Sequence, residues 1–282
     1  MSYRLNPAMP MSEALRSVAL AELDVAHSAL ARAPDRHKGV HNARKCCKRL
    51  RSVLLLARPG MPEPVFRNLT ARVANISKGL AAARDAQALL DAIDKLEQNT
   101  EPDASDGPMR SIRGWLHKRR HAAEQNLAQT TGSEAMRKLL EIRPAIAGLA
   151  VYPDKFTPLA KGIERCYRAT RTHFKSAIRS DEAEELHEWR KGVQQHWRHM
   201  QLLTPCWPSE LSARAEAARA LSQLLGDDHD IAMLMHLVMT PTMTFGSPED
   251  TTAFVKRCRK RHKALRKDAK IKGERLFVEK PG

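Results

Sequence analysis

One short stretch of the sequence concentrates positive charge inside an otherwise amphipathic segment. The run "HNARKCCKRLR", from His41 to Arg51, places six cationic or titratable side chains in eleven positions. On a helical wheel, with about 100° between successive residues, five of them fall on or beside one face. These five are His41, Arg44, Lys45, Lys48 and Arg51. Because cations three or four positions apart repel one another on a helix, such a row indicates a bound anion.

The row has the chemistry of a site for a linear polymer of phosphate groups. Over about 15 Å of helix it offers arginine forks, which bind two phosphate oxygens at once, and lysine point charges. A histidine beside phosphate also tends to be protonated, which adds pH sensitivity. For a single helix, a solvated basic face is the simpler interpretation.

A second segment repeats the row and favours binding over a merely solvated face. The run "LHEWRKGVQQHWRHMQLL" aligns with "VHNARKCCKRLRSVLLL" and carries cationic or titratable residues at matching positions. They are His187, Arg190, Lys191 and Arg198. Downstream, "ARDAQALL" aligns with "DHDIAMLM", which pairs Asp85 with Asp230, and "RRHAA" aligns with "KRHKA". Three matches in the same order indicate a duplicated unit of about 145 residues.

Helical periodicity dominates the chain, so the sequence predicts an all-α fold. The expected helices cover residues 12–33, 35–58, 65–97, 109–129, 134–142, 159–178, a segment ending at 203, helices within 210–238 and a final C-terminal helix. An Asp181–Glu184 capping box is expected before the segment that ends at 203. The duplication predicts one domain, 1–282, made of two tandem four-helix-bundle-like repeats. The first spans 10–150, the second spans 155–282, and pseudo-twofold symmetry relates them. A homodimer is also considered.

Composition restricts the class of partner. The formal net charge is +16 and the apolar content is 42%, with a pI of about 10.0. An excess of this size favours a nucleic acid, another polyanion or an anionic membrane surface as partner. Aromatic residues make up only 5% of the chain, which leaves few rings for stacking bases. The five cysteines are scattered, and we interpret them as reduced thiols. Without a signal core or an apolar run of about 20 residues, we expect a soluble cytoplasmic protein with no membrane contact.

Taken together, these motifs resemble the CHAD family, the conserved histidine α-helical domain. The resemblance rests on the two basic runs, on "ARDAQ", on "LLGDDHD" and on the terminal "GERLFVEKP", and it covers nearly the whole chain. It implies two four-helix bundles around a pseudo-twofold axis, with a basic surface or pore at their junction. It also implies binding of inorganic polyphosphate and association with polyphosphate granules. Gly192 and Gln194 are uncharged where relatives often carry a cation, so the second row is expected to bind less tightly.

The resemblance adds a third, lower-ranked group of cations. The segment "GIERCYRATRTHFK" resembles the basic opening helix of the family's second half. Its arginines are Arg165, Arg168 and Arg171. The corresponding helix of the first half has only Arg16, so this group is ranked below the row that begins at His41.

Several other clusters have a structural interpretation that is simpler than a catalytic one. We expect Asp85 and Asp230 each to pair with an inward cation rather than bind metal. "DDHD", residues 227–230, is interpreted as capping and first-turn residues at a helix junction after Gly226. His117 and His121 have ligand spacing but cationic neighbours, so a surface or anion-binding patch is favoured. His196 is expected to be a hydrogen-bonded core histidine. The basic C-terminal segment is expected to form a docked helix with a basic outer face.

Three functions follow from these observations. The favoured one is non-catalytic binding of inorganic polyphosphate through both rows, with no metal ion and no cofactor. A basic helical protein for DNA or RNA is the second, although no recognition helix or stacking aromatics are evident. The third is a metal-dependent phosphoanhydride hydrolase, which would require clustered carboxylates.

Overall fold

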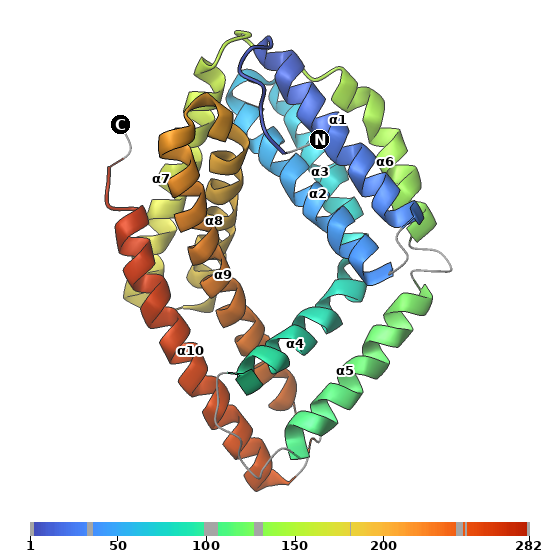
Figure 1. Ribbon diagram of the computed structural model, residues 1–282, viewed down its shortest axis with the longest axis vertical. Helices are drawn as coiled ribbons and strands as arrows, with labels where there is room; N and C mark the ends of the chain where they lie inside the picture. The colour runs from blue at the N-terminus through green and yellow to red at the C-terminus, as the bar shows by residue number, and fades with distance from the viewer. Residues whose placement is uncertain are drawn as a thin grey trace.

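The computed structural model describes residues 3–32, 36–98, 107–126, 132–180, 182–240, 245 and 247–280. Within these ranges every regular element is a helix, which confirms the all-α prediction (Figure 1). The α-helices are α1 (Met11–Arg32), α2 (Arg36–Ala57), α3 (Glu63–Gly79), α4 (Ala81–Gln98), α5 (Gly107–Asn126), α6 (Gly132–Ala147), α7 (Thr157–Ser180), α8 (Ala183–Leu203), α9 (Pro208–Val238) and α10 (Pro248–Leu276). Two short 3-10 helices, η1 (Arg58–Gly60) and η3 (Thr204–Cys206), follow α2 and α8.

The first group of helices, α1, α2, α3 and α6, encloses one apolar core. Leu15 of α1, Leu50 and Leu54 of α2, Leu69 of α3 and Ile142 of α6 are all buried there. These positions recur every three or four residues along each helix, which is the spacing that places apolar side chains on one face. The core therefore fixes which face of α2 points outward.

The second group, α7 to α10, has its own core. It contains Phe174 of α7, Trp189 and Val193 of α8, Leu221 of α9 and Phe277 after α10. The rings of Phe174 and Trp189 lie 5.1 Å apart, centroid to centroid, so aromatic contacts hold α7 against α8.

A third core joins α4 and α5 to the C-terminal half of α9 and the N-terminal half of α10. Ile93, Ile112, Leu234, Phe254 and Cys258 are buried in it. Figure 1 shows these four segments closing the lower part of the molecule. Helices from the predicted first repeat thus pack on helices from the predicted second repeat. The proposed division at residues 150–155 and the pseudo-twofold relation stay predictions.

One expected long helix is in fact two. The segment predicted as a single helix over 65–97 breaks between α3 and α4 at Leu80, whose side chain is fully buried. The break lets α3 remain in the first core while α4 crosses to the third (Figure 1). The periodicity of the segment does not reveal this bend, because each half has an apolar face of its own.

At residues 227–230 the sequence predicted a helix junction, but the structure has a continuous helix. No helix junction follows Gly226, because α9 continues through it to Val238. The capping interpretation of "DDHD" is therefore wrong. Asp227 and Asp228 instead form ion pairs between helices: Asp227 Oδ1 lies 2.6 Å from Lys95 Nζ of α4, and Asp228 Oδ1 lies 2.7 Å from His262 Nδ1 of α10.

Asp181, the first residue of one expected capping box, lies outside the described residues. At α10 a capping box is present, with Ser247 Oγ accepting from Asp250 N at 3.1 Å. All five cysteines are free thiols. In the described part of the chain, no helix has the length and apolar character that crossing a membrane requires.

Candidate anion-binding site

Two basic segments far apart in the sequence line one cavity of about 310 Å³, which we call the α2–α8 cavity. Its lining residues are His41, Arg44, Lys45, Lys48 and Arg49 of α2, and Gln194, Trp197, Arg198 and Gln201 of α8. Among the described residues, no carboxylate lines it. The cavity therefore gathers positive charge from both predicted rows.

The core face of α2 explains why its cations line the cavity. Cys46, Leu50 and Val53 are buried against the first core, and the opposite face carries the exposed His41, Lys45 and Lys48. The helical period alone imposes this separation. Arg51 is exposed on α2 but does not line the cavity.

Two arginines of the cavity are held in place by neighbouring helices. Arg44 Nη1 donates to the carbonyl of Ser77, at the C-terminal end of α3, at 2.5 Å. Arg49 Nη1 lies 3.1 Å from Glu22 Oε1 of α1, and its guanidinium stacks over the Tyr3 ring at 4.8 Å. Fixed guanidinium groups lose less conformational entropy when an anion binds.

Arg198 is the most unusual charge in the cavity. Burial lowers its pKa to about 10; Tyr3 partly opposes this effect, and the positive charges of Arg49 and Arg190 add to it. It therefore stays protonated at neutral pH. Its Nη1 donates to the Gln194 carbonyl at 3.0 Å, and among the described residues no carboxylate pairs with it. A half-buried cation without a counter-charge among the described residues is costly, and an anion in the cavity would offset that cost.

The C-terminal parts of α2 and α8 are in contact, and the two helices diverge towards their N-terminal ends (Figure 1). His199 Nε2 of α8 lies 3.1 Å from the Ser52 carbonyl of α2, and Gln195 Nε2 donates to Ser52 Oγ at 2.5 Å. This geometry brings only the C-terminal part of the second row, Arg198, to the shared cavity.

The other members of the second row lie in the N-terminal half of α8 and do not line the cavity. Lys191 Nζ pairs with Glu188 Oε1 at 2.5 Å on the same helix. Exposed His187 has its ring centroid 6.2 Å from that of His229. Burial lowers the pKa of Arg190, and the negative charge of Asp230 partly opposes this effect.

The third group, on α7, is not part of the cavity either. Arg165 is exposed, and Arg168 forms an ion pair with Glu164 one turn earlier. Arg171 Nε donates to the Phe277 carbonyl at 3.0 Å and so ties the segment after α10 to α7. For Arg171 this contact indicates a structural role.

The paired-aspartate interpretation holds for one of the two residues. Asp230 interacts with Arg190 and lies 3.1 Å from His229, measured from Oδ1 to Nδ1. Asp85 is exposed on α4, and no ion pair joins it to a described residue. Within the described ranges, no three His, Cys, Asp or Glu side chains are grouped so as to hold a metal ion.

His196 is a core residue, as expected, but its hydrogen bonding differs. It is buried between the rings of Tyr167 and Phe277, at centroid distances of 5.6 and 5.8 Å, and its Nε2 has no hydrogen-bond partner among the described residues. Burial lowers its pKa to about 3, so the ring is neutral at physiological pH.

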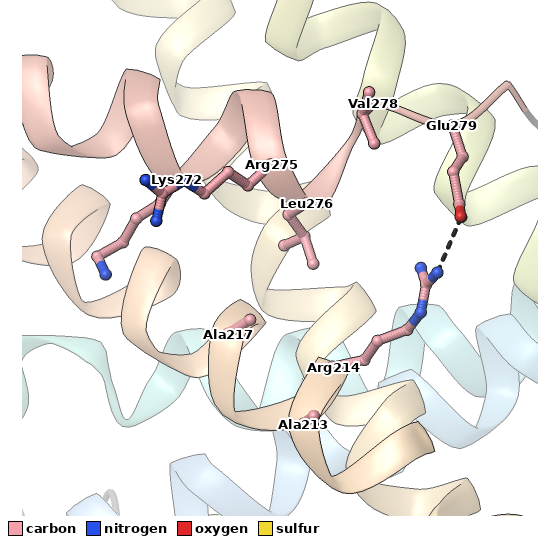
Figure 2. A pocket seen from close by; sticks show the side chains of 8 residues that line it. All are labelled: Ala213, Arg214, Ala217, Lys272, Arg275, Leu276, Val278 and Glu279. Atoms are coloured by element: carbon pink, nitrogen blue, oxygen red, sulfur yellow. Dashed lines mark hydrogen bonds and ion pairs between the residues drawn. The ribbon is translucent and has the colours of Figure 1, made fainter. Parts of the chain in front are cut away.

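A second cavity, of about 390 Å³, lies between the N-terminal half of α9 and the end of α10. Figure 2 shows Lys272 and Arg275 towards one end, Leu276 and Ala217 in the middle, and the ion pair of Arg214 with Glu279 at the other end. The Nη2–Oε2 distance in that pair is 2.8 Å. Because a carboxylate neutralises one cation and apolar side chains form part of the wall, this cavity suits a polyanion less well than the α2–α8 cavity.

Three residues that line the cavity, Arg49, Trp197 and Gln201, were not identified from the sequence. Arg49 belongs to the first run but lies about 80° from His41 on the wheel, beside the core face. Its charge reaches the cavity because Glu22 and Tyr3 hold it there. Trp197 and Gln201 carry no sequence signal for anion binding, and only the approach of α8 to α2 reveals them.

Comparisons with known proteins identify the family of this chain and similar solved structures. The family model described as "CHAD domain" matches residues 16–239. The crystal structure of the CHAD domain from the plant Ricinus communis is similar, with a TM-score of 0.67 and 18% identity, over 100% of this chain and 96% of that one. PptA from Streptomyces chartreusis has a TM-score of 0.66 and 13% identity, over 96% of this chain and 100% of that one. No curated protein matches the chain. At these identities the two structures establish the fold, and the family model establishes the family.

Proposed function

Because the chain belongs to the CHAD domain family, we propose that it is a non-catalytic binding protein for inorganic polyphosphate and that the α2–α8 cavity holds the polymer. The observation that carries the proposal is the composition of that cavity. Five cationic or titratable side chains of α2 and Arg198 of α8 line it, and among the described residues no carboxylate does.

Polyphosphate matches this arrangement better than a compact anion does. The first row continues from His41 along the exposed face of α2 to Arg51, beyond the cavity. A linear polymer can place one group near Arg198 and further groups along α2, so its affinity rises with chain length. Each phosphate contact releases counterions, so the affinity falls steeply with salt.

The proposed ligand also predicts where in the cell the protein is located. We propose that the protein accumulates on polyphosphate granules in the cytoplasm. A fluorescently labelled protein should concentrate on granules in cells that make polyphosphate and spread evenly in cells unable to make it. An even distribution in both strains would contradict this part of the proposal.

The decisive experiment is a binding titration with polyphosphates of defined length at several salt concentrations. The double variant Lys45→Gln, Lys48→Gln removes two exposed cavity charges, and Lys155→Gln, Lys161→Gln removes two exposed charges elsewhere. At about 1 kcal/mol for each lysine, the first variant should bind roughly 30-fold more weakly. Equal affinity of the two double variants would sink the assignment of the cavity.

The two alternative functions, nucleic-acid binding and phosphoanhydride hydrolysis, can be tested with the same purified protein. Duplex DNA that outcompetes long polyphosphate at physiological salt would favour a nucleic-acid-binding protein instead. Magnesium-dependent release of phosphate that disappears in Asp85→Ala or Asp230→Ala would identify a phosphoanhydride hydrolase.

A further inference from the structure

Among the helices of the described residues, α2 and α10 carry the largest formal positive charges, and only α2 lines the α2–α8 cavity. α2 contains seven lysines and arginines and no acid, and α10 contains eleven against four acids. Each helix therefore has a formal charge of +7, within a total of +16. No residue of α10 lines the cavity. The charge on α10 thus has no role in the site described above.

The cations of α10 form a row with the same spacing as the row on α2. Phe254, Cys258 and Leu265 are buried on one side of the helix. On the opposite side lies what we call the α10 row, whose members are all exposed: Lys256, Arg259, Lys260, Lys263, Lys267 and Lys270. Its first four members repeat the i, i+3, i+4, i+7 pattern of His41, Arg44, Lys45 and Lys48. At 1.5 Å per residue, the row extends over about 21 Å.

Between Lys256 and Lys270 no acid of α10 lies on the face of this row, because Asp268 falls about 80° beyond its nearest member on the helical wheel. Glu249 and Glu274 share that face only beyond the two ends of the row, with Glu274 one turn after Lys270. Among the described residues, none of the six cations forms an ion pair. Neighbours three and four positions apart therefore repel one another along the whole row, as they do on α2. A bound anion would relieve that repulsion.

The position of α10 separates the row from the cavity. Figure 1 shows α10 along the outer edge of the molecule, packed against α9, with α8 and α9 between it and α2. The buried face of α10 is turned towards α9, so the row points outward. A polymer bound in the α2–α8 cavity would leave the α10 row free.

We propose that the α10 row binds a second segment of polyphosphate, so that one protein molecule bridges two chains. This inference rests on the proposed function of the cavity. Polyphosphate is favoured over single-stranded nucleic acid because the aromatic residue of α10, Phe254, is buried and so leaves no ring beside the row on which a base could stack. Lysine charges also recognise phosphate without regard to bases. Bridging would gather polymer chains around the protein rather than merely coat them.

A sandwich assay tests the bridge. Long polyphosphate is immobilised, the protein is bound to it and washed, and capture of a second, fluorescent polyphosphate is measured. The test variant combines Lys256→Gln, Lys260→Gln, Lys263→Gln and Lys267→Gln, because glutamine preserves helix propensity. The matched control combines Lys118→Gln, Lys155→Gln, Lys161→Gln and Lys175→Gln, four exposed lysines spread over other elements. Thermal melting confirms that both variants are folded.

The expected result is specific to the second capture step. The test variant should still bind the immobilised polymer, while its capture of fluorescent polyphosphate falls at least tenfold and that of the control stays within twofold of wild type. Equal capture by test and control variants would show that the α10 row is a solvated face and overturn the bridge. Fluorescent duplex DNA captured in preference to polyphosphate, with the loss again confined to the test variant, would overturn the choice of ligand. In the background of the test variant, loss of binding to the immobilised polymer on adding Lys45→Gln, Lys48→Gln reports on the cavity alone, so failure of the bridge and failure of the proposed function are distinguishable.

Discussion

Arg198 offers the sharpest test, because the structure predicts that its removal changes stability and binding in opposite directions. Its pKa is lowered from 12.5 to about 10, chiefly by burial. A base whose pKa is lower in the folded state has a less favourable charged form there, at every pH below about 10. At about 1.4 kcal/mol per pKa unit, and after allowance for solvent screening of a partly exposed group, the cost at neutral pH is about 2 kcal/mol.

Arg198→Met removes that cost together with two favourable contacts. The hydrogen bond to the Gln194 carbonyl contributes about 1 kcal/mol. The contact of the guanidinium with the Trp197 ring, at 5.5 Å, contributes about 0.5 kcal/mol. The variant should therefore be as stable as wild type or more stable by up to about 1 kcal/mol, which corresponds to a Tm increase of at most about 3 °C.

Binding should respond in the opposite sense. A charge-assisted hydrogen bond to phosphate contributes about 1.5–3 kcal/mol, so affinity for polyphosphate should fall roughly 10- to 150-fold. The stabilisation that polyphosphate gives by mass action should shrink accordingly. Thermal melting with and without polyphosphate measures both effects, and Arg219→Met, at an exposed position of α9, is the control. A variant that melts more than 5 °C below wild type, or one that binds with unchanged affinity, would refute the reasoning.

Three further predictions concern the framework of the site. Burial lowers the pKa of His196 to about 3 and that of His199 to about 4, so between these values and about 6.5 the unfolded chain binds more protons than the folded one. Stability measured by urea unfolding should therefore fall as pH drops from about 6.5 to 4, by about 1.4 kcal/mol per pH unit for each histidine, and His196→Leu should reduce that slope. Gly162→Ala should lower the free energy of unfolding by about 1–3 kcal/mol, because a Cβ there would lie 2.1 Å from the Leu56 carbonyl oxygen of α2. Gly226→Ala, with open space around the new Cβ, should raise the free energy of unfolding by about 0.5–1 kcal/mol in the same assay. Arg171→Ala should lower stability by about 1 kcal/mol through loss of the bond to Phe277, while its polyphosphate affinity stays within twofold of wild type; a large loss of affinity would return this residue to the binding site.

Local patterns predicted much of the secondary structure correctly. The wheel for residues 41–51 separated the side chains that are exposed, such as Lys45, from those that are buried, such as Leu50, because helical period alone decides which residues share a face. The same reasoning predicted a docked α10 with a basic outer face. It could not place the break at Leu80 or the continuity of α9 through Gly226. In those places tertiary packing, rather than local preference, decides whether a helix bends.

The same reasoning from sequence predicted only part of the candidate site. Both rows of cations were evident from residue type and spacing, but nothing in the spacing indicated that Lys191 would pair with Glu188 or that Arg171 would hold the Phe277 carbonyl. An ion pair or a backbone contact depends on where a neighbouring acid or chain segment lies in space. Whether the row residues bind polyphosphate stays a prediction, which the titrations above test.

By itself, the amino-acid sequence determined that the protein is helical, that it is strongly basic, and that its cations lie in rows opposite an apolar face. Tertiary structure alone decided that Arg198 meets Lys45 and Lys48 in one cavity, while His187 and the row on α10 lie outside it. The physical reason is that helical period fixes the direction of a side chain only relative to its own helix axis. Which faces meet depends on how the three cores set the axes of α2, α8 and α10 relative to one another.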